Sequence, residues 1–411
     1  MVRLVKGQRV EAKRRRRDIF VVGVSHAGQH AYTAGLGIAI PYVVSAFHSN
    51  YAVVGVLLSF AAIAANALQV LALFVKRSSA RLLFTLQNLG STVGAVIAAV
   101  APSVYLVMLG RFVQSGSGWP QHPVGAAYLS NRYPKKRGTI LSWHVTAGNL
   151  GTLLAPLIVP VVVSGFGWRG AFWFLSAVLA LTTVLVATWL PSPWKKLPLE
   201  TAPSGEKSVH FWEEFKALLS RKGVIALLVS GIIASGGQGI GVVGVFTPAF
   251  LHDSLHETTF SMSFVMTTLY VGAVVGPILL GSTADRMGHR RVLLANYALG
   301  AVSLVTFVLL GRSLLTLAVS GLLVGIFTYS ELSLRQTLFS DLLSDPNARA
   351  GFGIFFTVSQ SIGSIWIAIL GIAVTDVGFV PAFLLMASTF VVAGLVVAVG
   401  TKSNLGGCAL E

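Results

Sequence analysis

The sequence predicts an all-α membrane protein whose twelve transmembrane helices form two pseudo-symmetric six-helix bundles. Hydrophobic residues make up 54% of the 411-residue chain, the mean hydropathy is +0.77 and only 11% of the residues are charged. Soluble chains carry about 25% charged residues, so this chain cannot cover itself with polar side chains. Apolar stretches recur from Ile19 to Gly400, and at about 20 residues each is long enough to cross a bilayer as a helix. A polar gap at residues 191–222 separates six such stretches from six others.

Hydropathy windows of about 19 residues define the individual helices. The gap at 191–222 holds four prolines, and we interpret it as a cytoplasmic linker. Residues 1–18 then form a basic cytoplasmic tail, residues 19–190 and 223–400 the two bundles, and residues 401–411 a second cytoplasmic tail. The expected helices are 19–47, 51–75, 81–101, 103–131, 138–164, 168–190, 223–251, 260–284, 291–311, 313–341, 349–375 and 378–400.

The two bundles are predicted to be related by duplication, because short motifs recur at a nearly constant offset. Gln29 matches Gln238 at an offset of 209 residues, and Pro134 matches Pro346 at an offset of 212. Transporters are commonly built from such internal repeats. The repetition therefore favours a transporter.

The net charge of +16 is explained by membrane topology and does not indicate a nucleic-acid partner. The sequence has no basic face interleaved with aromatic residues that would bind nucleic acid. With both termini in the cytoplasm, 26 of the 30 Lys and Arg residues lie on the cytoplasmic side, and only Arg169 and Arg312 lie in outer loops. Basic residues accumulate on that side, so we expect a multi-pass protein of the cell (cytoplasmic) membrane with both termini inside. The basic run at residues 13–17 is expected to contact anionic membrane lipids.

Several kinds of chemistry are excluded by what the sequence lacks. Cys408 is the single cysteine, so no Cys-based metal site is available. No Gly-x-x-x-x-Gly-Lys-Ser/Thr motif is present, and the glycine-rich stretch at residues 235–241 follows no predicted strand. We therefore expect no catalytic residues, no enzyme activity and no cofactor.

A short motif between the eighth and ninth expected helices indicates a gate. It reads Gly281-Ser-Thr-Ala-Asp285-Arg286-Met-Gly288-His-Arg290-Arg. Glycines permit a tight turn between helices, while an aspartate can pair with a basic group or a helix N-terminus of the neighbouring helix. Such contacts would hold the inner side of the protein closed.

This motif resembles the cytoplasmic-loop signature of the major facilitator superfamily, Gly-x-x-x-Asp-Arg-x-Gly followed by basic residues. Helices four to six are similar to that family as well, and the resemblance covers essentially the full chain. It implies a transporter fold of two six-helix bundles and a gating role for the loop. The second stretch consists of Gly110-Arg111-Phe-Val-Gln114, Tyr133-Pro134-Lys-Lys-Arg137-Gly138, Gly148-Asn149-Leu-Gly151, Pro156 and Gly167-Trp168-Arg169-Gly-Ala-Phe172.

Departures from the family pattern limit what can be carried over. In the first-half loop, Val75 stands where the family has Asp and Leu71 where it has Gly, so this copy of the gate is expected to be lost. Ser115 and Ala155 replace two further glycines, which leaves an exporter-type helix-five motif only partly present.

Two branches of the superfamily fit the residues equally well. Three stretches are similar to organic-anion symporters: Trp119-Pro120, Tyr-Pro-Lys-Lys-Arg-Gly and Gly-Trp-Arg-Gly-Ala-Phe. In contrast, His122-Pro123 followed by Gly148-Asn149-Leu-Gly151 resembles fosmidomycin-resistance-type exporters. Both branches remain open at this point.

Three polar residues of the first half are expected near the middle of the membrane. At about 1.5 Å per residue, His30 lies about 17 Å from the inner end of its helix, and Arg111 and Asn149 reach about the same depth. Ionisable groups at this depth are by default functional. Arg111 offers a fixed charge and forked donors that suit a carboxylate, phosphate or phosphonate; the alternative is a structural arginine bonded to carbonyls.

Other polar residues of the first half lie near these three. His26 stands one turn from His30 on the same face, and each histidine can act on the substrate or simply join two helices. Metal binding by His26 or His30 with His122 or His144 is permitted by the spacing, but no carboxylate assists it and we expect no metal site. The remaining first-half candidates for substrate contact are Gln29, Gln114 and His144.

In the second half, Glu331 is the only deep acidic residue, four residues before Arg335. One reading makes Glu331 the proton carrier, with His30 as a further proton-coupling candidate. The other joins Glu331 and Arg335 to Asp285 as an inner gate, because Arg335 lies near the cytoplasmic end of its helix. The remaining polar candidates for substrate contact are Gln238, Tyr329 and Gln360, which are also suited to joining helices.

The prediction is a secondary active transporter that moves a small organic anion across the cytoplasmic membrane by alternating access, coupled to protons. The alternative within the class is a proton-driven exporter of a drug or phosphonate. A channel or receptor fits less well, because the polar residues cluster at mid-depth and form no continuous stripe. The expected partners are a small anionic substrate, protons and membrane lipids, and the protein is expected to be a monomer.

Overall fold

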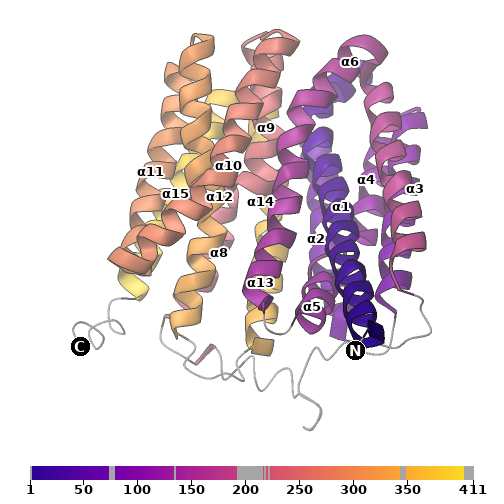
Figure 1. Cartoon of the computed structure of the whole chain (residues 1–411). Coiled ribbons are helices and arrows are strands. Elements are labelled where there is room, and N and C mark those ends of the chain that lie inside the picture. Colours follow the sequence, from indigo (N-terminus) through magenta and orange to yellow (C-terminus); the bar gives the residue numbers. More distant parts are fainter. Residues whose placement is uncertain are drawn as a thin grey trace. The chain divides into compact units, whose positions relative to one another are not determined.

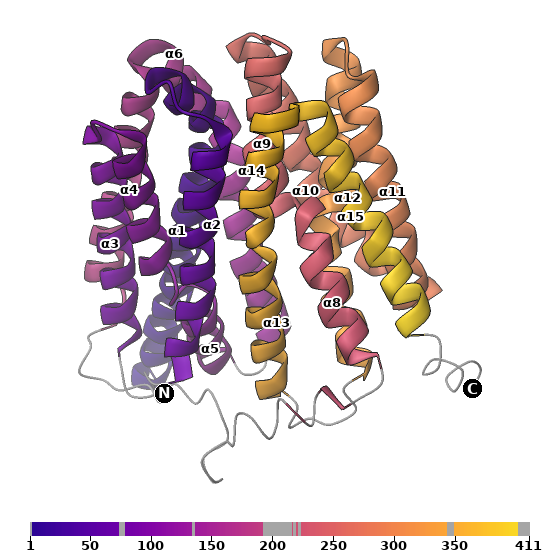
Figure 2. The same cartoon turned by 180° about the vertical axis from the view of Figure 1, so that it is seen from behind.

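The computed structural model describes residues 2–73, 79–133, 136–191, 216, 219–220, 223–342 and 349–401. Val75 of the first-half loop, most of the expected linker and the expected tail beyond Thr401 lie outside the described residues. Within the described ranges every regular element is a helix (Figures 1 and 2). The chain separates into two compact units. The first contains Met1–Ala39 and Leu68–Gly205, and the second contains Ile40–Ala67 and Glu206–Glu411.

The first unit is built from five α-helices and a short 3-10 helix. Figure 1 shows that the start of α1 and the helix α5 lie at the same end of this unit. Its core at that end includes Val22, Phe84 and Leu129, all fully or almost fully buried. The elements are α1 (Val2–Ala46, whose last turns from Ile40 belong to the second unit), η1 (Gln69–Leu73), α3 (Ala80–Val100), α4 (Val104–Ser117), α5 (Pro123–Arg132) and α6 (Arg137–Trp189).

Three of these helices differ from the sequence prediction. The first begins at Val2, so it includes the segment expected as a tail. The helix expected at 103–131 is interrupted at residues 118–122, where Gly118 and Pro120 leave no continuous ladder, and α5 starts with Pro123 in its first turn. Because proline lacks a donor and fixes φ, it suits a helix start but not a helix interior. The two helices expected at 138–164 and 168–190 are joined as α6, which turns back at Gly167 with a φ of 69° (Figure 1).

Close backbone approach positions two functional helices of the first unit. A Cβ on Gly94 of α3 would lie 2.5 Å from the carbonyl oxygen of Gly110 on α4. A Cβ on Gly151 of α6 would overlap the carbonyl oxygen of Ala27 on α1. Small residues let membrane helices pack this closely. As a result, α4 with Arg111 is fixed against α3, and α1 is fixed against α6.

The second unit contains the remaining helices. In Figures 1 and 2 the helices α10, α11, α12 and α15 run alongside one another. The elements are α2 (Tyr51–Leu68), α8 (Val224–Ala234), η3 (Ser235–Gly237), η4 (Gly239–Val243), α9 (Gly244–Ala249), η5 (Phe250–Ser254), α10 (Thr259–Met287), α11 (His289–Leu310), α12 (Leu314–Leu342), α13 (Arg349–Gly363), α14 (Ile365–Val377) and α15 (Phe379–Gly400).

The single helix expected at 223–251 is broken in the second unit. Gln238 is extended, with φ −71° and ψ 141°, between the 3-10 helix η3 and the π-helical turn η4. Gly241 has a φ of 96°, which glycine adopts without the clash that a Cβ would cause. The glycine-rich sequence thus unwinds the helix and turns Gln238 towards the interior. π-Helical turns often occur at functional sites.

Helix α2 belongs to the second compact unit, whereas the sequence boundary placed it in the first bundle. The reason is close packing on α14: a Cβ on Gly55 would lie 2.6 Å from the carbonyl oxygen of Ile367. Ser59 Oγ also donates to the Ser364 carbonyl at 2.8 Å. The division of the chain at residues 191–222 stays a prediction.

The chain is a multi-pass membrane protein. In the described part of the chain, nine stretches are long and apolar enough to cross a membrane. One of them, Thr139–Trp189, contains the reversal at Gly167 and is long enough to cross twice. Large apolar side chains such as Val161, Ile278 and Leu395 are about two-thirds exposed, as lipid-facing positions are.

Candidate functional site

Arg111 is held on α4 by neutral oxygen atoms. Its Nη1 donates to Thr33 Oγ1 of α1 at 3.3 Å and to Oε1 of Gln114, one turn further along α4. The guanidinium carbon lies 6.0 Å from the centre of the Tyr32 ring. No carboxylate among the described residues forms an ion pair with Arg111. The guanidinium therefore keeps a full positive charge inside a membrane helix bundle.

A buried hydrogen-bond network extends from Arg111 through the interior of the first unit. Gln114 Nε2 donates to Gln29 Oε1 at 2.8 Å, and Gln29 Nε2 donates to Ser91 Oγ at 3.0 Å. Asn88 continues the network with a donor 2.8 Å from Ser25 Oγ. Buried polar groups of this kind are costly unless paired. The structure thus brings Arg111, Gln114 and Gln29 together and links them across three helices.

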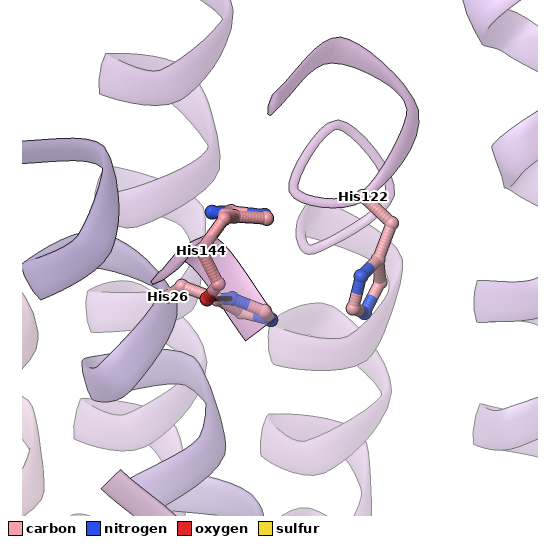
Figure 3. A group of neighbouring side chains, drawn as sticks. All are labelled: His26, His122 and His144. Atoms are coloured by element: carbon pink, nitrogen blue, oxygen red, sulfur yellow. Dashed lines mark hydrogen bonds between the residues drawn. The ribbon is translucent and has the colours of Figure 1, made fainter. Parts of the chain in front are cut away.

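Four histidines gather beside this network. His26 and His30 come from α1, His144 from α6, and His122 from the turn before α5. The His26 ring centre lies 4.6 Å from that of His30, 5.0 Å from that of His122 and 4.2 Å from that of His144. Figure 3 shows His144 stacked over His26, with His122 facing them from the other side. Three of the four were sequence candidates for substrate contact, and His122 was weighed only as a metal ligand.

Hydrogen bonds fix two of these rings. His26 Nδ1 lies 2.7 Å from the carbonyl oxygen of His144, and His30 Nδ1 lies 3.0 Å from Thr152 Oγ1. The third midplane candidate, Asn149, is half-buried on α6 and makes no side-chain hydrogen bond to the other described residues. It therefore has free donors and acceptors.

Glu331 and Arg335 form a fully buried ion pair on α12. Arg335 Nε donates to Glu331 Oε1 at 2.8 Å, and both side chains are 0% exposed. Tyr297 of α11 donates to the same carboxylate at 3.0 Å, and Arg335 Nη1 donates to Ser359 Oγ of α13 at 3.3 Å. A Cβ on Gly231 of α8 would overlap Arg335 Nη1. Residues of four helices, α8, α11, α12 and α13, therefore pack around or bond to this ion pair.

The unwound segment connects to the same carboxylate. Gln238 Nε2 donates to Glu331 Oε2 at 3.3 Å, and Gln360 Nε2 donates to Gln238 Oε1 at 3.4 Å. Tyr329 packs edge-on against Tyr270, with ring centres 6.0 Å apart. A Cβ on Gly239 would overlap the Tyr329 ring at Cδ2. The structure thus joins Gln238, Gln360 and Glu331 and places Tyr329 against the segment that carries Gln238.

The gate motif occupies the turn between α10 and α11. Gly288 has a φ of 91°, as the tight turn requires. Asp285 is 75% exposed and pairs with His289 at 3.2 Å, and His289 also contacts Asp341 of α12 at 2.6 Å. Arg290 donates to Thr401 Oγ1 at 2.8 Å.

The other gate positions lie apart from the buried pair. Arg286 is exposed at the end of α10, and a Cβ on Gly281 would meet nothing within 4 Å. In the described contacts, Asp285 binds His289 at the turn, whereas Arg335 binds Glu331 in the interior. The gate and the buried pair are thus two separate groups of contacts, although the sequence interpretation had joined Asp285 to Arg335.

A second ionic contact lies at one end of the first unit. Arg132 Nε donates to Asp18 Oδ2 at 3.1 Å, and Tyr128 donates to the same oxygen at 3.0 Å. Burial raises the pKa of the Asp18 carboxyl, and the opposing effects of the Tyr128 hydrogen bond and the Arg132 charge leave it above its ordinary value. This contact ties α1 to α5.

Sequence reasoning missed several partners of the predicted residues. The α1 positions Ser25, Gln29 and Thr33 follow a spacing of four and share one face, so the network face was readable from the sequence. In contrast, Tyr297 and Ser359 are far from Glu331 and Arg335 along the chain, and only the fold brings them together.

Comparison with known proteins gives a family model and distant relatives. The model of the Major Facilitator Superfamily matches residues 22–264 and 234–404. The "Cis,cis-muconate transport protein" of Acinetobacter baylyi is 26% identical over 186 residues, which cover 44% of this chain and 43% of that protein. The match therefore spans less than half the length of that relative.

Two further relatives match over more of their length. The "Probable 4-methylmuconolactone transporter" of Cupriavidus pinatubonensis is 24% identical over 76% of this chain and 73% of that protein. The "Multidrug resistance protein MdtG" of Yersinia enterocolitica is 25% identical over 73% of this chain and 70% of that protein.

Solved structures of similar fold support the architecture. The nucleoside transporter NupG superposes with a TM-score of 0.76 at 17% identity and covers 95% of this chain and 99% of that one. A bacterial homologue of the human lysosomal transporter Spinster gives a TM-score of 0.71 at 14% identity, with 95% of each chain covered. The helical transporter fold predicted from the sequence is thereby confirmed.

Proposed function

Because the chain belongs to the Major Facilitator Superfamily and is a transporter rather than an enzyme, we propose that it moves a small organic anion across the cytoplasmic membrane. Transport is by alternating access and is coupled to protons. The chain acts as a monomer, with both termini in the cytoplasm, as the distribution of Lys and Arg favours.

The observation that supports an anionic substrate is the environment of Arg111. Its guanidinium is bonded to Thr33 and Gln114, which supply neutral oxygens only. A charge at membrane depth is costly unless an opposite charge compensates it. An incoming carboxylate would supply that charge and take two parallel hydrogen bonds from the guanidinium. Gln114 and Gln29 then orient the arginine, and His26, His30, His144 and Asn149 provide further hydrogen-bonding groups in the same unit.

The names of two relatives agree with this substrate class. One is named for the transport of cis,cis-muconate and the other for 4-methylmuconolactone. An organic acid is the chemistry that Arg111 would recognise.

Proton coupling is assigned to Glu331. Its carboxylate accepts hydrogen bonds from Arg335, Tyr297 and Gln238. Protonation of Glu331 would neutralise one member of the ion pair and release Arg335 and Gln238 from a charged acceptor. Since Gln238 lies in the unwound segment, this step would change the conformation of that segment. His30, bonded to Thr152, is the second proton-coupling candidate.

Ligand-dependent thermal stability of the purified protein tests the substrate class. We expect cis,cis-muconate at 100 times its dissociation constant to stabilise the protein by about 2.7 kcal/mol, because a ligand of the native state raises stability by mass action. Arg111→Gln should abolish this shift. The matched control is Arg312→Gln, an exposed arginine in an expected outer loop, which should keep it. An unchanged shift in Arg111→Gln would contradict the role of Arg111.

Transport in proteoliposomes tests the coupling. We expect Glu331→Gln to lose accumulation driven by an imposed proton gradient but to keep exchange of labelled for unlabelled substrate, because exchange needs no net proton movement. Gradient-driven accumulation at the wild-type rate would contradict the assignment of Glu331.

Export of a drug is the second candidate function, favoured by the relative named as a multidrug resistance protein. A lipophilic cation such as tetraphenylphosphonium distinguishes the two. Stabilisation by this cation, without stabilisation by organic acids or phosphonates, would replace the anion proposal.

A further inference from the structure

The histidine cluster of the first unit has the composition and spacing of a metal site. One ligand nitrogen from each of His26, His122 and His144 lies within 4.8 Å of the other two. In a tetrahedral site with metal–nitrogen bonds of about 2.0–2.1 Å, the ligand nitrogens stand about 3.3 Å apart. The rings must therefore turn to reach this spacing. The exposed side chain of His122 is free to move towards the other two, and the stacked rings of His26 and His144 must tilt so that both point at the ion.

The hydrogen bond of His26 prepares its ring for a metal ion. Nδ1 lies 2.7 Å from the carbonyl oxygen of His144, and a carbonyl oxygen can only accept. The proton of the neutral ring is therefore on Nδ1, and Nε2 carries the free electron pair. Histidines that bind metals almost always donate their other N–H in this way to a carbonyl or carboxylate.

At least one ring nitrogen of His26 and one of His144 are available to a ligand. His26 Nε2 and both ring nitrogens of His144 are buried and make no hydrogen bond among the described residues, although the Gln121 backbone lies near the His144 ring. A buried acceptor without a donor costs about 1–3 kcal/mol. A metal ion would satisfy His26 Nε2 and one His144 nitrogen at once.

Two glycines provide the space that the His26 and His144 rings occupy. A Cβ on Gly148 of α6 would lie 2.8 Å from His26 Cε1, and a Cβ on Gly125 of α5 would lie 3.2 Å from His144 Cε1 and Nε2. Any other residue at position 148 would push His26 out of its position. The position of the His26 ring beside His144 thus depends on the absence of a side chain at residue 148.

We propose that His26, His122 and His144 bind a divalent transition-metal ion such as Zn²⁺, Ni²⁺ or Co²⁺. Imidazole nitrogen suits these ions, whereas Mg²⁺ and Ca²⁺ prefer the oxygen ligands that this cluster lacks. Three protein ligands leave one coordination position open, and exposed His122 gives the ion access. His30 stands beside the site with its Nδ1 already bonded to Thr152. The absence of a carboxylate, which led the sequence interpretation away from a metal, leaves the bound ion with its full positive charge.

This proposal goes beyond the proposed function and does not depend on it. The metal would be bound whether or not the transported substrate is an organic anion. The two failures are distinguishable, because anion stabilisation can be measured in excess EDTA and metal binding can be measured without any organic anion.

The test is Co²⁺ and Zn²⁺ binding to the full-length protein in detergent, with the affinity tag removed and bound metal stripped with EDTA. We expect one Co²⁺ per chain, with the intense visible absorption of a four-coordinate ion, and its displacement by Zn²⁺. The dissociation constant should rise about tenfold or more in His122→Ala, since even outer-shell partners contribute 10–100-fold. His122 is exposed, so this variant is expected to fold.

The matched control is His48→Asn, which changes a histidine outside the cluster with a φ of 48°, a conformation that asparagine tolerates. It should bind Co²⁺ as the wild type does. Gly148→Ala, with all four histidines intact, should weaken binding as His122→Ala does, because the new methyl group displaces the His26 ring. No visible Co²⁺ spectrum, or equal binding by His122→Ala and the wild type, would overturn the proposal.

Discussion

Removal of the Glu331 carboxylate is the perturbation whose cost the structure defines best. In Glu331→Gln the guanidinium of Arg335 would stay 0% exposed without its negative partner. Breaking a buried ion pair by removing one partner costs about 3–5 kcal/mol, because the other charge remains buried and uncompensated. Tyr297 and Gln238 can still bond to the amide, so the loss is one of charge more than of hydrogen bonds.

For a large chain, 1 kcal/mol corresponds to about 2 °C in melting temperature, so Glu331→Gln should lower it by about 6–10 °C. The assay is thermal unfolding of the purified protein in detergent at neutral pH. Asp376→Asn, which changes an exposed carboxylate at the end of α14, is the matched control and should shift the melting temperature by about 1 °C or less.

The double variant Glu331→Gln/Arg335→Gln separates the charge effect from lost packing. With both charges removed, we expect at least half of the lost stability to return, because no uncompensated charge remains. A melting temperature of Glu331→Gln within about 2 °C of the wild type would refute the reasoning. The reasoning would also be refuted if the double variant lost more stability than the two single variants lose together.

Three further predictions concern packing, the Asp18 contact and α2. Gly94→Ala should cost about 1–3 kcal/mol in stability, because its Cβ would lie 2.5 Å from the Gly110 carbonyl oxygen. The control Gly281→Ala has open space around it and should cost nothing. Equal melting temperatures for the two variants would contradict the packing argument. Burial holds the pKa of Asp18 above its ordinary value of 3.8, so the wild type should lose stability relative to Asp18→Asn as the pH rises above about 4. The opposite slope in thermal unfolding would show that the ion pair dominates. Tyr51→Phe removes the hydrogen bond to Asp253 and should lower stability by about 1 kcal/mol, which the same unfolding assay measures against the distant variant Tyr105→Phe.

The positions of the membrane helices followed from hydropathy because burial in lipid requires long apolar runs whatever the tertiary contacts are. The interruptions did not follow in the same way. The break at Gln238 lies in an apolar, glycine-rich stretch whose hydropathy is that of a continuous helix. The Tyr329 ring, which occupies the space beside Gly239, shows why a glycine is needed at that position. Hydropathy averages over a window and has no information on such a local contact.

The candidate residues could be predicted in type, but their partners could not. Charge and depth alone singled out Arg111 and Glu331, because few ionisable groups are present within the spans. The spacing of four along α12 predicted the Glu331–Arg335 pair correctly. In contrast, His122 lies in a turn that hydropathy placed within a helix, so the direction of its side chain could not be predicted. Its approach to His26 depends on the break before Pro123.

The repeat relation gives the two halves different electrostatic roles. At the offset of 209 that relates Gln29 to Gln238, His122 corresponds to Glu331. In the second half this position carries a carboxylate that a neighbouring arginine neutralises at 2.8 Å. In the first half it carries an imidazole, and the arginine that precedes it on α4, Arg111, has only neutral partners. The first half therefore holds an uncompensated positive charge, and the second holds a closed ion pair that a proton can open. Because an anion is attracted only to the former and a proton acts most strongly on the latter, we expect Arg111→Gln to abolish substrate binding and Glu331→Gln to preserve it.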